Sequence, residues 1–197
     1  MSVNLSARQF TDPALAGEVM RVLKETGLKP ARVHLEVTES MLADDPKMAQ
    51  ETLKQLSTMG VALEVDDFGT GYSCLGQLNQ LPFDTLKIDR SFVQALDQER
   101  DGHKMIDSIV RLADSLDISV VAEGIETAEH WAYIASLGCR SGQGYYFSRP
   151  LNEEAALALA EERFAKPWPV PTPQSASLTG LIGFTGSLRN APRVVTK

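Results

Sequence analysis

Polar side chains recur at the ends of short apolar runs along this chain. Glu36, Asp66 and Glu123 each stand in or directly after such a run, and Asn4 and Lys87 hold equivalent places. Buried carboxylates that share a small space repel one another unless cations neutralise them. Oxygen ligands without a cluster of histidines or cysteines favour hard divalent cations such as Mg²⁺ or Mn²⁺. Two such cations can activate water and stabilise the leaving oxygen of a phosphodiester, so these residues indicate metal-assisted phosphodiester hydrolysis.

The elements that position these residues follow a strand–helix rhythm. β-rich runs predict strands at Val3–Ser6, Val33–Thr38, Val61–Asp67, Thr85–Asp89, Ser119–Glu123 and around Tyr145–Phe147. Helix-like segments are Ala14–Thr26, Lys47–Met59, His103–Leu116, Ala128–Leu137 and Asn152–Phe164. Asp or Thr before the segment and Gly after it mark the first, second and fourth of these. This rhythm predicts parallel strands joined by right-handed crossovers, either in an open doubly wound sheet or in a barrel.

The alternation within the strands favours the barrel. Parallel sheets that are covered on both faces show continuous apolar runs. Here Val33, Leu35 and Val37 alternate with polar residues, and the other runs behave in the same way. One face would pack on helices and the other would line a polar interior, so the fold class is α/β, a TIM-type (β/α) barrel with its active site at the C-terminal ends of the strands. The polar face collects Asn4, Glu36, Asp66, Lys87, Asp89 and Glu123.

Charge and proline content divide the chain in two. Residues 1–165 hold 15 basic and 26 acidic residues, whereas residues 166–197 hold four basic residues, no acidic residue and half of the ten prolines. We therefore expect one domain over residues 1–165 and a Pro-rich, disordered tail over residues 166–197. The net charge of −7 argues against broad attraction to a DNA or RNA duplex.

The sequence shows no feature that indicates a membrane-spanning or secreted protein. No run approaches the roughly 18 apolar residues of a membrane helix, and the first residues do not resemble a signal peptide. The two cysteines, Cys74 and Cys139, lack metal-type spacing and fit a reducing compartment, so we expect a cytoplasmic protein.

Six sequence strings resemble the motifs of EAL domains, in the order and at the spacing of that family. The string Asp66-Asp67-Phe68-Gly69-Thr70-Gly71-Tyr72-Ser73 is similar to the family's DDFGTGYS motif. The others are Val3-Asn4-Leu5-Ser6, Leu35-Glu36-Val37-Thr38-Glu39-Ser40, Leu86-Lys87-Ile88-Asp89-Arg90-Ser91-Phe92, Val121-Ala122-Glu123-Gly124-Ile125-Glu126 and Gln143-Gly144-Tyr145. Alone, Asp66-Asp67 before Gly69 also fits a turn that ends a strand, but six strings in register are specific.

The resemblance implies hydrolysis of cyclic di-GMP to linear pGpG with two Mg²⁺ or Mn²⁺ ions, in a protein that dimerises through the region after Asp67. It implies metal ligands at Asn4, Glu36, Asp66, Asp67 and Glu123. It makes Glu123 the candidate general base and Lys87 the residue that positions the water or stabilises charge on the phosphate. Glu39 would brace the loop that starts at Phe68. Asp89, Glu126 and Gln143 would shape the metal and nucleotide site.

The sequence departs from the family at two places. The Glu-Ala-Leu motif, which the family carries before the strand of Asn4, is absent here, and with it a glutamate metal ligand. Glu64 stands where the family usually has a small residue. On the polar face, Glu64 would pair with a cation, partly replace the missing carboxylate or perturb the site.

These departures leave three functions open, namely a cyclic di-GMP phosphodiesterase, a catalytically inactive binder of the dinucleotide, and a dimerisation module. About six strands are present where such a barrel needs about eight. We therefore expect an open barrel with an exposed strand at Val3–Ser6, in a chain that self-associates, needs the missing piece or is poorly soluble.

Overall fold

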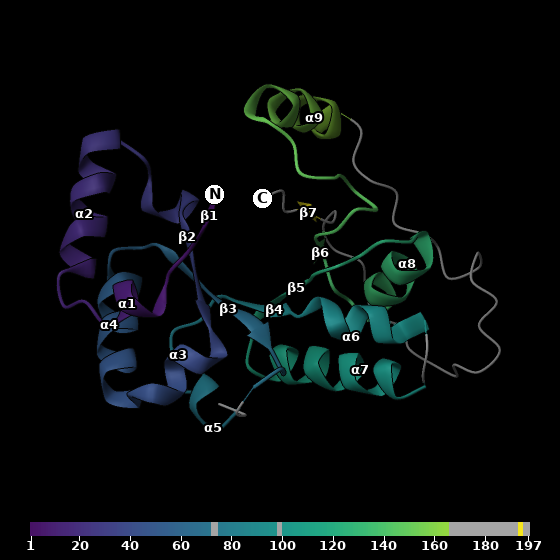
Figure 1. The fold of residues 1–197 in the computed structure, drawn as a ribbon, viewed down its shortest axis with the longest axis horizontal. Coiled ribbons are helices and arrows are strands. Elements are labelled where there is room, and N and C mark those ends of the chain that lie inside the picture. Colours follow the sequence, from purple (N-terminus) through teal and green to yellow (C-terminus); the bar gives the residue numbers. More distant parts are fainter. Residues whose placement is uncertain (72–74, 98–99, 166–192, 195–197) are drawn as a thin grey trace. The chain divides into compact units, whose positions relative to one another are not determined.

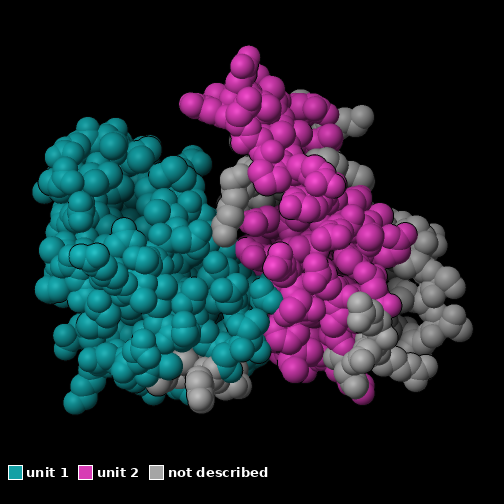
Figure 2. All heavy atoms as spheres, in the orientation of Figure 1, with its two compact units in different colours: residues 1–89, 112–119 teal, residues 90–111, 120–197 magenta. Residues whose placement is uncertain are grey.

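The structure is a computed structural model that describes residues 1–71, 75–97, 100–165 and 193–194 (Figure 1). The chain divides into two compact units, drawn in separate colours in Figure 2. Unit 1 comprises residues 1–89 and 112–119, and unit 2 comprises residues 90–111 and 120–197.

Four parallel strands form the sheet of unit 1. They are β1 (Ser2–Asn4), β2 (His34–Thr38), β3 (Ala62–Phe68) and β4 (Thr85–Ile88), and they pair in that order. Val37, Leu63 and Leu86 are fully buried, because alternate side chains face the helices that cover one side of the sheet. Within unit 1, β1 is the edge strand, and its Val3 side chain is exposed.

Helices follow the strands of unit 1 on the expected pattern. They are α1 (Ala7–Phe10), α2 (Leu15–Thr26), α3 (Glu39–Asp44), α4 (Pro46–Thr58) and α5 (Leu75–Leu78), with a 3₁₀ turn η1 at Pro30–Arg32. Asp45 caps α4, since its carboxylate accepts a hydrogen bond from the Met48 N–H at 3.1 Å. Gly27 ends α2 in the left-handed conformation, with φ of 68°.

Unit 2 contains most of strand β5 (Ser119–Ala122), which pairs in parallel with β6 (Ser141–Gly142), and β6 pairs with the short β7 (Arg193–Val194). Its other elements are α6 (Arg90–Gln94), η2 (Ala95–Asp97), α8 (Ala128–Ser136) and α9 (Glu153–Ala165). Helix α7 (Arg100–Ser115) begins in unit 2 and ends in unit 1. Trp131 and Phe147 pack edge to face in the core of unit 2, with ring centroids 5.3 Å apart.

Most of the expected elements are present, with ends shifted by a few residues. The prediction of the sixth strand around Tyr145–Phe147 is wrong, and the strand is Ser141–Gly142. Tyr145–Phe147 is a turn, in which the Phe147 N–H donates to the Gly144 carbonyl at 3.0 Å. Aromatic residues are enriched in strands, which is why the sequence predicts a strand here, but Phe147 instead packs on Trp131. The expected tail lies outside the described residues apart from Arg193–Val194. No helix within the described residues is long and apolar enough to cross a membrane.

Candidate active site

A buried ion cluster joins three strands of unit 1. The ammonium of Lys87 on β4 donates to Glu36 Oε2 on β2 at 2.8 Å and to Asp66 Oδ1 on β3 at 2.9 Å. The side chains of Lys87 and Glu36 are each 1% exposed, and that of Asp66 is 11% exposed. Charges this deeply buried must neutralise one another. Loss of any one of the three side chains would therefore leave an uncompensated charge in the core.

The register of the strands explains why these side chains meet. Glu36 lies opposite Glu64, and Thr38 lies opposite Asp66 in the β2–β3 pair. Residues two apart on a strand share a face, so Glu36, Glu64 and Asp66 line the same side of the sheet. Asn4, the last residue of β1, is the register partner of Glu36 and has an exposed side chain. The structure thus places Asn4 and Glu36 on adjacent strands.

Asp66 and Asp67 have different surroundings although they are neighbours. Asp66 is buried and its Oδ1 also accepts the Asp67 N–H at 3.2 Å. Asp67 is exposed and takes the left-handed conformation, with φ of 54°. The β3–β4 register shifts between Val65 and Phe68, so the strand is irregular at the two aspartates.

The donor set of unit 1 fits a hard divalent cation by its chemistry. Asn4, Glu36, Asp66 and Asp67 offer amide and carboxylate oxygens, which Mg²⁺ and Mn²⁺ prefer. Within the described residues, no group of three or more His, Cys, Asp or Glu side chains is arranged as a metal site. The two buried carboxylates, Glu36 and Asp66, converge on the Lys87 ammonium.

Glu39 lies at the start of α3 and is 3% exposed. Its Oε2 accepts the Gly69 N–H at 3.2 Å, and a Cβ at Gly71 would lie 3.6 Å from the same oxygen. The side chain therefore holds the backbone that follows Phe68. This contact is of the kind expected for a residue that braces the loop, and any role of Glu39 in substrate binding stays a prediction.

Glu64 is buried and makes two contacts that the sequence did not predict. Its Oε1 lies 2.6 Å from His34 Nδ1, and its Oε2 accepts the Ser2 hydroxyl at 3.4 Å. The structure gives Glu64 a histidine and a serine as hydrogen-bond partners, and the three alternatives for its role in the site stay predictions. The alternation of side chains along the strands predicts His34 and Glu64 on one face of the sheet. Their diagonal contact depends on the register of β2 and β3, which the sequence does not give.

The remaining expected site residues lie at strand ends. Asp89 follows β4 in unit 1 and is half-buried. In unit 2, Glu123 follows β5 and is half-buried, and Glu126 is exposed. The backbone of Gln143 clips the loop after β5, because its N–H donates to the Ala122 carbonyl at 2.8 Å and its carbonyl accepts the Ile125 N–H at 3.0 Å.

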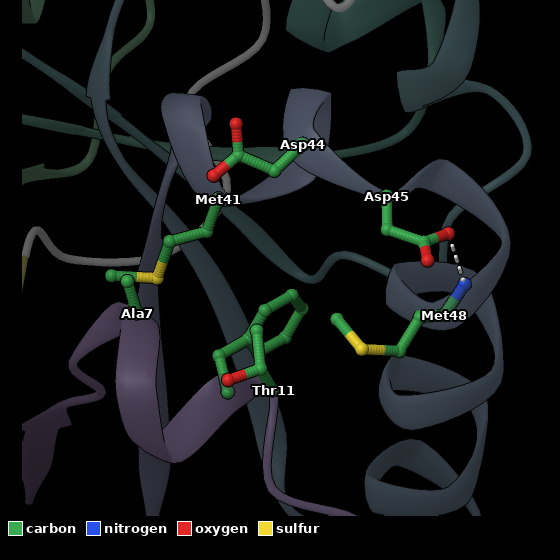
Figure 3. A pocket seen from close by; sticks show the side chains of 7 residues that line it. Ala7, Thr11, Met41, Asp44, Asp45 and Met48 are labelled. Carbon is green, nitrogen blue, oxygen red and sulfur yellow. Dashed lines mark hydrogen bonds between the residues drawn. The ribbon is translucent and has the colours of Figure 1, made fainter.

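A small pocket of about 170 Å³ lies between α1, α3 and α4 (Figure 3). Met41, Met48 and Thr11 line it, and Asp45 at its edge is used as the cap of α4. None of the expected site residues lines it, so the pocket is not the chemical site.

The sequence profile of the EAL domain matches residues 1–150. This chain belongs to the EAL domain family. The EAL chain is 42% identical over 158 residues to the bifunctional diguanylate cyclase/cyclic di-GMP phosphodiesterase MucR of Pseudomonas aeruginosa. The aligned segment covers 80% of this chain and 23% of MucR. It is 40% identical to the cyclic di-GMP phosphodiesterase RocR of the same species, over 80% of this chain and 40% of RocR.

Solved structures of EAL proteins share the fold. The MucR phosphodiesterase in complex with c-di-GMP superimposes with a TM-score of 0.76 at 42% identity, over 79% of this chain and 63% of that chain. A manganese and c-di-GMP complex of BlrP1 from Klebsiella pneumoniae gives a TM-score of 0.69 at 36% identity, over 75% of this chain and 38% of that chain. The expected α/β fold of TIM-barrel type, with parallel strands, is confirmed, and the EAL chain spans less than half the length of these two curated relatives.

Proposed function

We propose that this EAL chain hydrolyses cyclic di-GMP to linear pGpG with Mg²⁺ or Mn²⁺. The observation that carries the proposal is the buried cluster of Lys87 with Glu36 and Asp66, in a family whose named relatives act on cyclic di-GMP. A buried, mutually neutralised cluster of carboxylates costs several kcal/mol to build in a low-dielectric interior. Its place on three parallel strands is typical of an active site in this fold.

The ligand roles follow from the oxygens that unit 1 offers. Asn4, Glu36, Asp66 and Asp67 would hold the divalent cations, which supply Lewis-acid stabilisation of the phosphate and lower the pKa of a bound water. Glu36 and Asp66 are held in place by Lys87 Nζ, so their carboxylates are pre-oriented before any ligand binds. Lys87 would also stabilise negative charge on the phosphate.

Glu123 is the proposed general base. It would take one proton from the attacking water, whose oxygen forms a bond to phosphorus while the bond from phosphorus to one ribose oxygen breaks and that oxygen gains a proton. The product is then a linear dinucleotide with a terminal phosphate. Glu39 would brace the loop after Phe68 through the Gly69 N–H, and Asp89, Glu126 and Gln143 would shape the nucleotide site.

The direct experiment measures pGpG formation by chromatography, with the purified chain, cyclic di-GMP and Mn²⁺. Glu123→Ala removes the proposed base, and Glu129→Ala is the matched control because Glu129 is an exposed glutamate six residues further on. Turnover that is lost in Glu123→Ala and kept in Glu129→Ala supports the proposal. Equal turnover in both variants contradicts the role of Glu123.

A second candidate function is binding of cyclic di-GMP without cleavage. The Lys87 ammonium pairs with both Glu36 and Asp66, so these carboxylates already have a cationic partner in place of a catalytic metal ion. Calorimetric titration with the dinucleotide and Ca²⁺ separates the two functions, and a BlrP1 complex with calcium and the dinucleotide shows that this combination binds in a related EAL protein. Binding without turnover in Mn²⁺ identifies a binder, and neither binding nor turnover leaves a dimerisation module.

Assembly and location complete the proposal. The exposed Val3 on the edge strand β1 favours self-association, and we propose a homodimer. Sedimentation that shows a stable monomer at micromolar concentration contradicts it. A cytoplasmic location fits the two thiols without metal-type spacing, of which Cys139 is buried and free.

A further inference from the structure

A buried histidine links two parts of unit 2, the loop after β5 and the turn η2. His130, on α8, is 3% exposed. Its Nδ1 lies 3.4 Å from the Glu126 backbone nitrogen, and its Nε2 lies 3.0 Å from Asp97 Oδ1 on η2. One imidazole therefore joins the loop after β5 to the turn at Asp97, which lies 33 residues before His130 in sequence.

The two contacts fix the tautomer of His130. A backbone N–H can only donate, so Nδ1 must accept the Glu126 bond and carries no proton. The Asp97 carboxylate can only accept, so Nε2 carries the proton. The neutral imidazole with its proton on Nε2 satisfies both neighbours, and the other neutral tautomer satisfies neither.

Backbone geometry shows that the loop between Glu123 and Glu126 is held on several sides. Gly124 has φ of 72°, and a Cβ there would lie 2.5 Å from Arg90 Cβ on α6. The Ile125 N–H is held by the Gln143 carbonyl at 3.0 Å. The Thr127 hydroxyl caps α8 by accepting the His130 N–H at 3.1 Å. The His130 imidazole is the side chain that anchors the Glu126 end.

We propose that His130 is a positioning residue that ties the Glu126 backbone to Asp97 and thereby fixes the loop that carries Glu123. This inference rests on the proposed function, because Glu123 and Glu126 are expected to act on cyclic di-GMP. In this proposal, His130 has no contact with the nucleotide or the reacting atoms. Asp97, whose side chain is 63% exposed, acts on the Glu126 backbone indirectly, through His130.

Paired substitutions separate the two hydrogen bonds. Asp97→Ala removes the acceptor of the Nε2 proton, whereas Asp97→Asn keeps an oxygen acceptor. His130→Gln places an amide near the Nε2 position and loses the acceptor for the Glu126 N–H, whereas His130→Asn places an amide near Nδ1 and loses the link to Asp97. Because Asp97 is largely exposed, its variants are expected to fold even if those of His130 do not.

The first readout is hydrogen exchange of the Glu126 amide, measured by NMR without any ligand. Asp97→Ala should speed this exchange about two- to tenfold, the effect of losing one hydrogen bond, and Asp97→Asn should restore it. A histidine that only fills the core predicts no change at Glu126 in either Asp97 variant. Equal exchange in Asp97→Ala and the unmodified chain, or a proton found on Nδ1 by ¹⁵N NMR, overturns the proposal.

The second readout is the affinity for cyclic di-GMP in Ca²⁺, measured by calorimetry. We expect Asp97→Ala to weaken binding about two- to tenfold and Asp97→Asn to bind as the unmodified chain does. Unchanged affinity in Asp97→Ala contradicts a positioning role toward the nucleotide. If the unmodified chain does not bind, the proposed function fails, and the exchange of the Glu126 amide still decides whether His130 anchors the loop.

Discussion

Lys87 and Glu36 form an ion pair at 2.8 Å in which each side chain is only 1% exposed. The same ammonium pairs with Asp66, so one cation neutralises two buried anions. Removing it as Lys87→Met should destabilise the chain by about 3–5 kcal/mol, because the two carboxylates are then buried beside each other. Urea unfolding measures this free energy.

The control for Lys87 is Lys24→Met, an exposed lysine on α2 of the same unit. Its effect should stay within about 0.5 kcal/mol. Mn²⁺ should recover part of the stability of Lys87→Met, because a cation can neutralise the same oxygens. If Lys87→Met is as stable as Lys24→Met, the ion pairs of Lys87 do not stabilise the buried cluster.

The His34–Glu64 contact should show measurable coupling. A double-mutant cycle with His34→Ala and Glu64→Ala isolates the interaction, and we expect about 1–2 kcal/mol, since the contact is a short hydrogen bond to a buried carboxylate. Urea unfolding of the four proteins gives the value. Additive effects of the two substitutions would mean that Glu64 is satisfied by other groups.

Glu39 should act through the Gly69 N–H rather than through its charge. Glu39→Ala removes the acceptor at 3.2 Å and should speed exchange of the Gly69 amide while lowering stability by about 1–3 kcal/mol. Glu39→Gln keeps an acceptor oxygen and should preserve slow exchange. Exchange that is equally fast in both variants would show that the charge, not the hydrogen bond, holds the loop.

Gly124 and Gly17 should respond to alanine in opposite directions. Gly124→Ala should cost about 1–3 kcal/mol, because φ is 72° and the added Cβ would lie 2.5 Å from Arg90 Cβ. Gly17→Ala, within α2 and with nothing within 4 Å of the new Cβ, should stabilise by about 0.5–1 kcal/mol. Thermal unfolding measures both, and a loss of stability at Gly17 would contradict the helix.

Burial raises the pKa of Cys139 to about 12. In a Cys74→Ser background, iodoacetamide should therefore modify Cys139 about a hundredfold or more slowly in the native chain than in urea. Because the folded pKa lies above the unfolded value of about 8.5, the free energy of unfolding should fall as the pH rises from there through the folded pKa. Cys139→Ser should remove most of that slope, and native alkylation as fast as in urea would contradict burial.

Strand alternation was enough to predict that Glu36, Asp66 and Lys87 share one face, because the side-chain period of two does not depend on partners. It could not predict that Lys87 joins both carboxylates, since that depends on register and rotamers across three strands. The contact between His130 and Asp97 could not be predicted for a similar reason, because it joins a helix and a turn that are distant in sequence. The aromatic run Tyr145–Phe147 wrongly predicted a strand, because the packing of Phe147 on Trp131 outweighs β-propensity.

The most direct test of the central claim is the rate of pGpG formation from cyclic di-GMP in Mn²⁺ for the unmodified chain, Glu36→Gln and Glu25→Gln. Glu36 is a buried carboxylate and a proposed metal ligand, whereas Glu25 is exposed on α2. We predict turnover that depends on Mn²⁺, is lost in Glu36→Gln and is unchanged in Glu25→Gln. Equal turnover in Glu36→Gln and Glu25→Gln would contradict a catalytic site built on Glu36, Asp66 and Lys87.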